Sequence, residues 1–432
     1  MAEATRQFDQ DAAQRTWEFV HSLLRDYPNR DFTVELWNGE CWLPEKNQFH
    51  RFTWKINRPD ALKTVLLSSN RQIALAEAYI YGDFDIVGDI EAIFPLAEHF
   101  ITRKWSVQEK LNLLRLLGWS AVKPTHDTHR LAPHPEGQLH SRRRDGQAVR
   151  YHYDVSNDFY ALWLDPNMVY SCAYFEHADD DLGTAQKNKL DYVCRKLRLK
   201  AGERLLDIGC GWGGLIVHAA RQYGVRAVGV TLSQRQFTWA QERIRDFGLS
   251  EQCEVRLLDY RDVDEAGAYD KLVSIGMVEH VGESRLTEYF GQAYRLLRSG
   301  GVFLNSGIGR PGKARIIDNQ PTFTDRYIFP DGELVSIGSM LSHAERAGFE
   351  VCDVENLREH YRLTVTQWLH RLDKHAEEAR RLVGEDKYRM WRLYLAGSAY
   401  YFQRGWLDLY HTLLLKSEDG KTNTPLTRAE WH

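Results

Sequence analysis

Hydrophobic and polar residues in the second half of the chain follow strand-like and helix-like periods in alternation. Short apolar runs such as ERLLDIG (203–209) and AVGVTL (227–232) are typical of buried strands. Each is followed by a segment of helical period, GWGGLIVHAARQYG (211–224) and SQRQFTWAQERIRDFG (233–248). The runs CEVRLLD, YDKLVSIG and GGVFLNSGI add further strands. This alternation predicts an α/β fold, with a doubly wound and mostly parallel sheet that binds ligands at the carboxyl ends of its strands.

The pattern of the first 122 residues is different and predicts a smaller α+β domain. Residues 12–26 place apolar side chains at helical spacing, and 71–117 are mainly of helical period. FTVELW (32–37) and HRFTWKI (50–56) are typical of strands. No residue group here suggests catalysis, so we assign residues 1–122 to lipid docking or dimerisation.

Residues 123–150 form a predicted exposed linker, rich in Pro, His and Arg, which precedes a catalytic domain at 151–432. The run Arg142-Arg143-Arg144 has two interpretations. It is either part of a solvated tether or a local anion patch that contacts phosphate head groups.

Composition narrows the function classes. The 432 residues carry 56 Lys and Arg against 60 Asp and Glu, a formal net charge of −4, so no basic excess predicts a nucleic-acid partner. The six cysteines include no CxxC pair, and we expect no metal site. The N-terminus lacks the features of a signal peptide, and no run of about 18 apolar residues occurs. The expected location is the cytoplasm, with reduced thiols.

A glycine-rich segment, LDIGCGWGGL (206–215), joins the first strand of the predicted sheet to the helix that follows. Its glycines allow a tight turn and close approach of the backbone to a ligand. A dinucleotide site would prefer an acidic residue about 20 residues further on, for the ribose hydroxyls. The next strand ends instead in Thr231, Leu232 and Ser233. The segment therefore favours S-adenosylmethionine over a dinucleotide.

Two side chains near the ends of later strands have both a functional and a structural interpretation. Asp259, followed by Tyr260, occupies the position that faces adenine in this fold. Its carboxylate can accept from the exocyclic amine, cap a helix, or do both. Gln236, in the first turn of a predicted helix, is either a ligand of ribose or adenine or a plain surface glutamine.

Four further segments occur in order along the chain: HYDVSNDFY (152–160), MVYSCAYF (168–175), GMVEHVG (276–282) and YIFPDGEL (327–334). Together with the glycine-rich segment they resemble the cyclopropane fatty acid synthase family. That family also includes mycolic-acid methyltransferases and fatty-acid methylases, and its fold is that of class I (Rossmann-like) methyltransferases. The similarity extends from about Ala76 to about Leu415.

The resemblance implies S-adenosylmethionine as cofactor and a set of residues that bind it. His152, Tyr153, Tyr170 and Ser171 resemble a lid over the cofactor, although His152 has packing or capping as an alternative. The implied cofactor-binding residues are Tyr153, Tyr170, Ser171, Asp207, Gly209, Gly211, Thr231, Leu232, Gln236, Asp259 and Tyr260.

The family's chemistry implies a second group of residues. Methyl transfer to the double bond of an unsaturated acyl chain creates a carbocation, and a bound bicarbonate removes a proton from it. The bicarbonate cradle resembles Cys172, Glu279 and Tyr361, of which Glu279 carries most weight. Structural alternatives are a surface acid for Glu279, packing for Cys172 and a hydrogen-bonded core tyrosine for Tyr361. The neighbouring His280 is expected to be structural, because adjacent side chains of an extended segment point opposite ways.

Such a site also needs a dry apolar tunnel and aromatic faces near the cation. Aromatic residues make up 12% of the chain, which fits this need. The candidates are Tyr174, Phe175, Tyr361, Trp391, Tyr394, Tyr400 and Tyr401.

One departure from the family bears on proton removal. Ser306, in FLNSGIG (303–309), stands where the family strand carries a bicarbonate-binding histidine. Serine donates a hydrogen bond but is shorter and uncharged. Either bicarbonate still binds, or a protein carboxylate such as Glu279 or Glu333 replaces it. A second family cysteine corresponds to Ser398 here.

The leading hypothesis is S-adenosylmethionine-dependent alkylation of unsaturated phospholipid acyl chains, with a cyclopropane product. A fatty-acid methylase giving a methylene- or methyl-branched chain is the alternative, and a non-catalytic lipid-binding subunit is the lesser one. A methyltransferase for a small polar acceptor fits the aromatic C-terminal region less well, because we expect a helical insertion of the catalytic domain to bind the acyl chain. We expect peripheral membrane binding through the N-terminal domain and Arg142–Arg144, and a homodimer or a partner reductase as further possibilities.

Overall fold

The computed structural model describes residues 2–28, 30–46, 48–116, 131–133, 135–311, 321–420 and 424–429, and these form two compact units. Unit 1 comprises Met1–Ala132, Ile316–Tyr327 and Gly384–Gly397, and unit 2 comprises Pro133–Arg315, Ile328–Val383 and Ser398–His432. Residues 123–130 and 134 of the predicted linker lie outside the described residues.

Unit 1 contains a four-stranded mixed sheet with the order β2-β1-β3-β4. β3 pairs parallel with β1 and antiparallel with β4, and the aromatic rings of Phe32 and Phe52 stack on paired positions of β1 and β3. The predicted α+β character of this region is confirmed. Its elements are α1 (Ala2–Leu24), β1 (Phe32–Leu36), β2 (Cys41–Trp42), β3 (Phe52–Ile56), α2 (Ala61–Leu67), α3 (Arg71–Ile80), β4 (Phe84–Gly88), α4 (Phe94–Thr102), α5 (Val107–Leu116), α12 (Phe323–Tyr327) and most of α16 (Glu385–Gln403).

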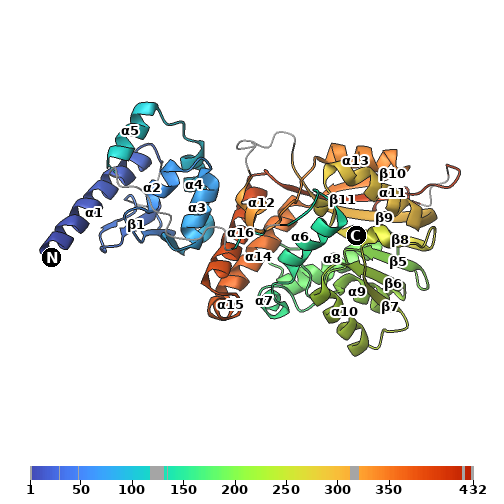
Figure 1. Ribbon diagram of the computed structural model, residues 1–432. Helices are drawn as coiled ribbons and strands as arrows, with labels where there is room; N and C mark the ends of the chain where they lie inside the picture. The colour runs from blue at the N-terminus through green and yellow to red at the C-terminus, as the bar shows by residue number, and fades with distance from the viewer. Residues whose placement is uncertain are drawn as a thin grey trace. The chain divides into compact units, whose positions relative to one another are not determined.

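Unit 2 is built on a seven-stranded sheet with the order β10-β11-β9-β8-β5-β6-β7 (Figure 1). The five strands from β9 to β7 pair in parallel, which confirms the predicted sheet. β11 alone runs against its neighbours β9 and β10. The strands are β5 (Arg204–Ile208), β6 (Arg226–Thr231), β7 (Cys253–Leu257), β8 (Tyr269–Ile275), β9 (Leu297–Gly309), β10 (Glu350–Asn356) and β11 (Asp408–Leu415).

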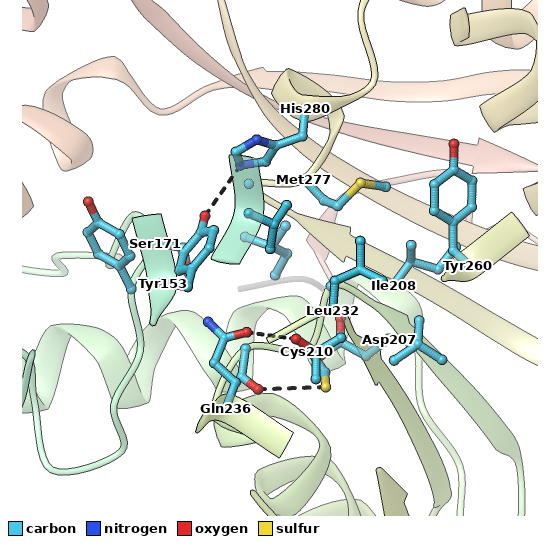
Figure 2. Close-up of a pocket in the computed structure, with 18 of the residues that line it drawn as sticks. Tyr153, Ser171, Asp207, Ile208, Cys210, Leu232, Gln236, Tyr260, Met277 and His280 are labelled. Atoms are coloured by element: carbon cyan, nitrogen blue, oxygen red, sulfur yellow. Dashed lines mark hydrogen bonds between the residues drawn. The ribbon is translucent and has the colours of Figure 1, made fainter. Parts of the chain in front are cut away.

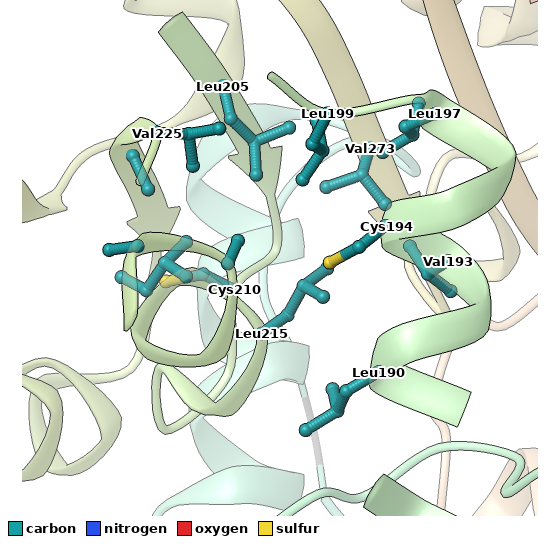
Figure 3. Close-up of a cluster of buried hydrophobic side chains, with 14 of the residues drawn as sticks. Leu190, Val193, Cys194, Leu197, Leu199, Leu205, Cys210, Leu215, Val225 and Val273 are labelled. Carbon is teal, nitrogen blue, oxygen red and sulfur yellow. The ribbon is translucent and has the colours of Figure 1, made fainter. Parts of the chain in front are cut away.

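Helices cover both faces of this sheet, because successive strand residues point to opposite faces and both faces are apolar. On β8, Val273 belongs to a buried cluster with α8, α9 and α10, shown in Figure 3, whereas Leu272 belongs to a second cluster with α11 and α13. The helices of unit 2 are α6 (Arg142–Tyr153), α7 (Asn157–Ala161), α8 (Leu182–Leu197), α9 (Gly214–Tyr223), α10 (Gln234–Asp246), α11 (Leu286–Leu296), α13 (Ile337–Arg346), α14 (Arg358–Lys374) and α15 (Ala376–Val383).

The linker expectation is wrong for residues 142–150, which form the first part of α6. The three arginines at its start are paired with carboxylates of unit 2. Arg142 Nη1 lies 2.5 Å from Asp262 Oδ1, and Arg144 Nε lies 2.5 Å from Asp331 Oδ2. Arg143 Nη2 lies 2.8 Å from Glu136 Oε2. The run is therefore bound to the protein's own acids, which leaves less of its charge for a lipid surface.

The C-terminal region also differs from the predicted helical insertion. Residues 384–397 group with unit 1, and residues 408–415 form β11 inside the sheet of unit 2. Leu413, Leu414 and Leu415 are all buried because β11 has helices on both faces. A strand buried on both faces loses the alternation by which strands are recognised. Among the described residues, no helix has the length and apolar character needed to cross a bilayer.

Candidate functional site

The glycine-rich segment forms the turn between β5 and α9. Gly209, Gly211 and Gly213 have φ angles of +84°, +54° and +80°, in the region that favours glycine. A Cβ on Gly209 would lie 3.0 Å from Cγ of Met277. A Cβ on Gly211 would meet no atom within 4 Å, so its backbone borders open space. Glycine therefore brings the backbone of this turn to the edge of a cavity.

That cavity lies wholly within unit 2, at the carboxyl ends of β5, β6 and β8 (Figure 2). It brings together every residue for which the sequence predicts cofactor binding. These are Tyr153, Tyr170, Ser171, Asp207, Gly209, Gly211, Thr231, Leu232, Gln236, Asp259 and Tyr260. They come from α6, from the segment before α8, from the first turn of α10 and from the ends of β5, β6 and β7. Their contact with a cofactor remains a prediction that this common lining supports.

Hydrogen bonds orient the polar side chains at the end of β6. Ser233 caps α10 by accepting from the backbone N–H of Gln236 at 3.2 Å. The hydroxyl of Thr231 donates to Oε1 of Gln236 at 2.7 Å. Because the amide oxygen is engaged in this way, the NH₂ group of Gln236 remains as the donor for a ligand. Gln236 is buried, so its interpretation as a surface residue is wrong.

Asp259 has a structural role in addition to the predicted one. Its carboxylate accepts from the backbone N–H of Arg261 at 3.0 Å and caps a short 3₁₀ turn. It also forms a bidentate pair with the Arg261 guanidinium, at 2.9 and 2.6 Å. Arg261 in turn donates to Asp145 of α6 at 3.1 Å. The capping interpretation is confirmed, and the remaining acceptor capacity of Asp259 still faces the cavity.

The predicted lid residues on α6 divide into one that lines the cavity and one that packs behind it. The hydroxyl of Tyr153 lies 3.4 Å from Nε2 of His280 (Figure 2). His152 is buried, with its Nδ1 3.0 Å from the carbonyl oxygen of Ile328 and its ring 4.1 Å from that of Phe329. Of the two interpretations of His152, packing is the one that these contacts support.

The four predicted catalytic residues do not line this cavity but converge beside it, around Ile308 of β9. Cys172 and Tyr361 belong to one small apolar cluster with Ile308, Leu357, Leu409 and Tyr174. Glu279 follows β8, and its Oε1 accepts from the backbone N–H of Ile308 at 2.7 Å. Ser306 lies two residues before Ile308 on the same face of β9. The structure thus brings these four side chains to one place.

The carboxylate of Glu279 is enclosed, which excludes its interpretation as a plain surface acid. Oε2 is inaccessible and has no hydrogen-bond partner. Burial raises the pKa of Glu279 to about 7. At neutral pH this side chain can therefore hold or release a proton at small free-energy cost, as a general base must.

Burial also keeps the Cys172 thiol protonated. Glu333 differs from the four catalytic candidates because its side chain is half exposed. Burial raises the pKa of the Cys172 thiol far above neutrality, so Cys172 is a thiol and not a nucleophilic thiolate. Glu333, a candidate replacement for bicarbonate, is half exposed and accepts from the backbone N–H of Glu283 at 2.9 Å. Of the two candidate carboxylates, Glu279 is therefore the one at Ile308. Among the aromatic candidates, Trp391 and Tyr394 belong to unit 1.

Sequence reasoning missed several residues that line the cavity, among them His280 and Lys189. His280 was expected to point away from the site because an extended segment was assumed, but residues 278–280 form a 3₁₀ turn. Lys189 of α8 donates to Oγ of Ser171 at 3.0 Å, and burial lowers its pKa to about 8. Gln186 lies three residues before Lys189, so the two polar side chains share one face of α8, and both are buried. This spacing is the feature of the sequence that could have indicated the role of Lys189.

The model of the mycolic acid cyclopropane synthetase family matches residues 140–412. The chain belongs to this family. Residues 19–102 match a second family, described only as a domain of unknown function. A "Probable fatty acid methyltransferase" of Pseudomonas putida is 45% identical over 305 residues, which cover 69% of this chain and 76% of that protein. A protein of the same description from Mycobacterium tuberculosis is 40% identical over 385 residues, covering 84% and 87%.

Solved structures of family members resemble about two thirds of this chain. A cyclopropane synthase from Mycobacterium tuberculosis is 33% identical with a TM-score of 0.59, over 66% of this chain and 99% of that one. A mycolic acid cyclopropane synthase crystallised with SAH and CTAB is 35% identical with a TM-score of 0.59, over 62% and 97%. The protein is accordingly an S-adenosylmethionine-dependent methyltransferase of a family that modifies lipids.

The residues of the cavity fit this cofactor. The open backbone at Gly211 and Gly276 allows close approach of a ligand. Hydroxyl, amide and carboxylate groups are available for an amino acid and a ribose, and apolar side chains such as Ile208 and Leu232 are available for an adenine.

Proposed function

We propose that the protein alkylates the double bond of unsaturated fatty acyl chains of phospholipids, through a carbocation that closes to a cyclopropane ring. The observation that carries this proposal is the enclosed carboxylate of Glu279 beside the apolar cluster of Cys172 and Tyr361. A carbon–carbon double bond is a weak nucleophile. Its alkylation needs a dry site, a group that stabilises a cation and a group that accepts a proton.

Each requirement has a counterpart in unit 2. S-adenosylmethionine, held by the cavity residues, supplies an electrophilic methyl group. The rings of Tyr361 and Phe402 lie 4.8 Å apart, and that of Trp368 lies 5.9 Å from Tyr361, so aromatic faces are available to stabilise the cation. Leu357 and Leu409 exclude water from the same cluster.

Proton removal is assigned to the surroundings of Glu279. The backbone N–H of Ile308 holds one carboxylate oxygen and leaves the other without a partner. In the ionised form this oxygen stabilises the cation and helps to orient the group that accepts the proton. Ser306 offers bicarbonate a hydroxyl in place of the histidine found in the family, so any bound bicarbonate is held without a charged partner from this position.

A methylene- or methyl-branched product is the second candidate, and it has specific support. The relatives that are 45% and 40% identical are both described as fatty acid methyltransferases. When the cation lies on the carbon next to the one that bears the new methyl group, loss of a methyl proton closes the ring. When a hydride first shifts so that the cation lies on the carbon that bears the methyl group, loss of a methyl proton leaves an exocyclic methylene. Reduction of that alkene to a methyl branch requires a hydride donor, for which a partner reductase is the expected source.

The experiment incubates the full-length protein with S-adenosylmethionine and vesicles of a monounsaturated phospholipid, with bicarbonate supplied or stripped out. The acyl chains are then analysed by mass and by proton NMR. Cyclopropane protons support the leading proposal, and an exocyclic methylene signal supports the second. A Glu279→Gln variant is the matched control for enzyme-dependent product. The absence of any added carbon would refute both.

Access to lipid is proposed to occur by peripheral binding of unit 1 to the membrane. Flotation with anionic and neutral vesicles, at low and high salt, tests this step. Because the Arg142–Arg144 run is paired internally, we expect salt to weaken the association only modestly. Sedimentation of the same samples distinguishes a monomer from a homodimer.

A further inference from the structure

Two buried polar atoms beside the cluster at Ile308 have no hydrogen-bond partner. They are Oγ of Ser306 on β9 and Nδ1 of His411 on β11. Both residues are almost fully buried, with 1% and 2% of their surface exposed. An unsatisfied buried polar atom costs about 1–3 kcal/mol, so two together call for an explanation.

The register of the sheet places the two side chains opposite one another. Ser306 pairs with His411 across β9 and β11, and with Ile275 across β9 and β8. Residues opposite one another on neighbouring strands point to the same face, with Cβ atoms about 4.5–5.5 Å apart. Ile275 lines the cofactor cavity. One row therefore leads from the cavity, through the hydroxyl of Ser306, to the imidazole of His411.

The next row towards the carboxyl end of β9 is the apolar one. Ile308 pairs with Leu409, two residues from Ser306 and His411 respectively, and both belong to the cluster of Cys172. The polar row thus directly adjoins the proposed reaction centre. On the other face of the same strands the polar groups are satisfied, since the hydroxyl of Thr412 donates to the carbonyl oxygen of Asn305 at 3.0 Å.

We propose that Ser306 and His411 act as a proton-accepting pair for the reaction. This inference rests on the proposed alkylation of a double bond. A C–H bond of the substrate cation breaks, and its electron pair forms the last carbon–carbon bond of the ring or a new double bond. The Ser306 hydroxyl, which makes no hydrogen bond to His411 in the resting structure, takes the proton and passes its own to Nδ1 once the two side chains come within hydrogen-bond distance. The resulting imidazolium loses its proton to water after the product leaves.

The surroundings of His411 keep its imidazole neutral. Its ring lies 6.3 Å from that of Tyr192, and the hydroxyl of Tyr192 donates to Glu355 at 2.7 Å. Glu355 is the register partner of His411 on β10. Burial, together with the charges of Lys196, Lys189 and His360, lowers the pKa of His411 well below its usual value. The imidazole is therefore neutral at pH 7, with one nitrogen that accepts.

The pair takes over the task that the family resemblance assigned to bicarbonate. The imidazole that the family carries at the position of Ser306 is supplied here from the neighbouring strand. Glu279 then stabilises the cation and does not receive the proton. Turnover of the wild-type enzyme should consequently be the same with and without bicarbonate.

The test compares four full-length proteins: wild type, His411→Ser, the double exchange Ser306→His/His411→Ser, and Thr412→Val. Thr412→Val is the matched control, because it removes a buried hydrogen bond on the same strand but on the other face. Cofactor affinity, initial rate and acyl product are measured for each. His411→Ser should lower the rate at least tenfold with cofactor affinity within twofold of wild type. The double exchange should recover most of that loss, and Thr412→Val should change neither quantity more than twofold.

If His411 had a purely structural role, the double exchange should be less stable and less active than His411→Ser, because it changes two buried residues instead of one. The inference is overturned if His411→Ser keeps more than half of the wild-type rate, or if the folded double exchange is no better than His411→Ser. A wild type that adds no carbon to lipid refutes the proposed function instead. In that case ¹⁵N NMR of labelled histidines still tests the role of His411. A His411 ring that is already an imidazolium at pH 7 could not accept a proton, and this result would overturn the inference.

Discussion

Replacement of Lys189 by methionine should stabilise the cofactor-free protein, although it removes a hydrogen bond. Lys189 is 2% exposed, and its ammonium donates to the Ser171 hydroxyl at 3.0 Å. Burial lowers its pKa from 10.5 to about 8, which costs the folded state about 3 kcal/mol below pH 8. Methionine keeps the unbranched stem and removes the charge. After about 1 kcal/mol is subtracted for the lost hydrogen bond, the expected gain at pH 7 is about 2 kcal/mol.

The pH dependence gives this prediction its sign. Between pH 8 and pH 10.5 the unfolded chain still binds the proton that the folded protein has released. The stability of the wild type therefore rises with pH through this window, and the advantage of Lys189→Met shrinks. Urea unfolding at pH 7 and pH 9.5 measures both effects. The transition of unit 2 is identified as the one that S-adenosylhomocysteine shifts to higher urea.

Lys196, two turns along α8, provides a control of opposite sign. Its ammonium is fully buried but pairs with Asp353 at 3.1 Å and with Glu355 at 2.9 Å. Lys196→Met takes the buried ammonium from these carboxylates and leaves them only Arg428 and the Tyr192 hydroxyl as partners, so it should destabilise by about 3 kcal/mol. Our reasoning on Lys189 fails if Lys189→Met is less stable than wild type at pH 7, or if its advantage does not shrink at pH 9.5.

Three further predictions concern turnover and cofactor binding. Glu279→Gln should lower the rate by a factor of about 10²–10⁴. Its affinity for the cofactor, measured by calorimetry, should stay within twofold of wild type, and a loss of affinity as large as the loss of rate would indicate a folding defect. The wild-type rate should rise with pH through about 7, because the raised pKa of Glu279 keeps it partly protonated below that value, and this rise should be absent from the residual activity of Glu279→Gln. Gly209→Ala should weaken cofactor binding at least tenfold, because its φ of +84° is unfavourable for alanine and the new Cβ would lie 3.0 Å from Met277. Gly202→Ala, with the same φ and nothing within 4 Å, should bind the cofactor as wild type does, and equal weakening in both would refute the role of the close contact.

The cofactor side of the site was accessible from the sequence because its determinants are local. Asp207 lies at the end of a recognisable strand, and Gly209 and Gly211 follow that strand directly. The rule that parallel strands end at one edge brings Thr231 and Asp259 to the same place. No long-range pairing has to be known for this inference. Side chains that line one cavity from several strand ends are therefore the part of a parallel sheet that sequence predicts well.

The missed features depend on pairings between distant segments. Arg144 looks like part of a basic tether until Asp331, 187 positions away, is found beside it. A functional role of His411 is suggested only by its register opposite Ser306, which the sequence alone does not reveal. β11 itself was not predicted, since a strand buried on both faces shows no alternation. His280 was misjudged for a smaller reason, because a 3₁₀ turn and an extended segment direct consecutive side chains differently.

Burial brings the carboxylates of the candidate site close to the pH at which their charge changes. It raises the pKa values of Glu279 and Asp207 to about 7 and lowers that of His280 to about 4. Ionised carboxylates with nothing to balance them would be costly in such a site. Carboxylates with a pKa near 7 avoid this cost, because a nearby cation itself lowers their pKa and so increases their charge. Under the proposed reaction the same residues can thus accommodate a cationic cofactor, then a cationic acyl chain, and finally a neutral product.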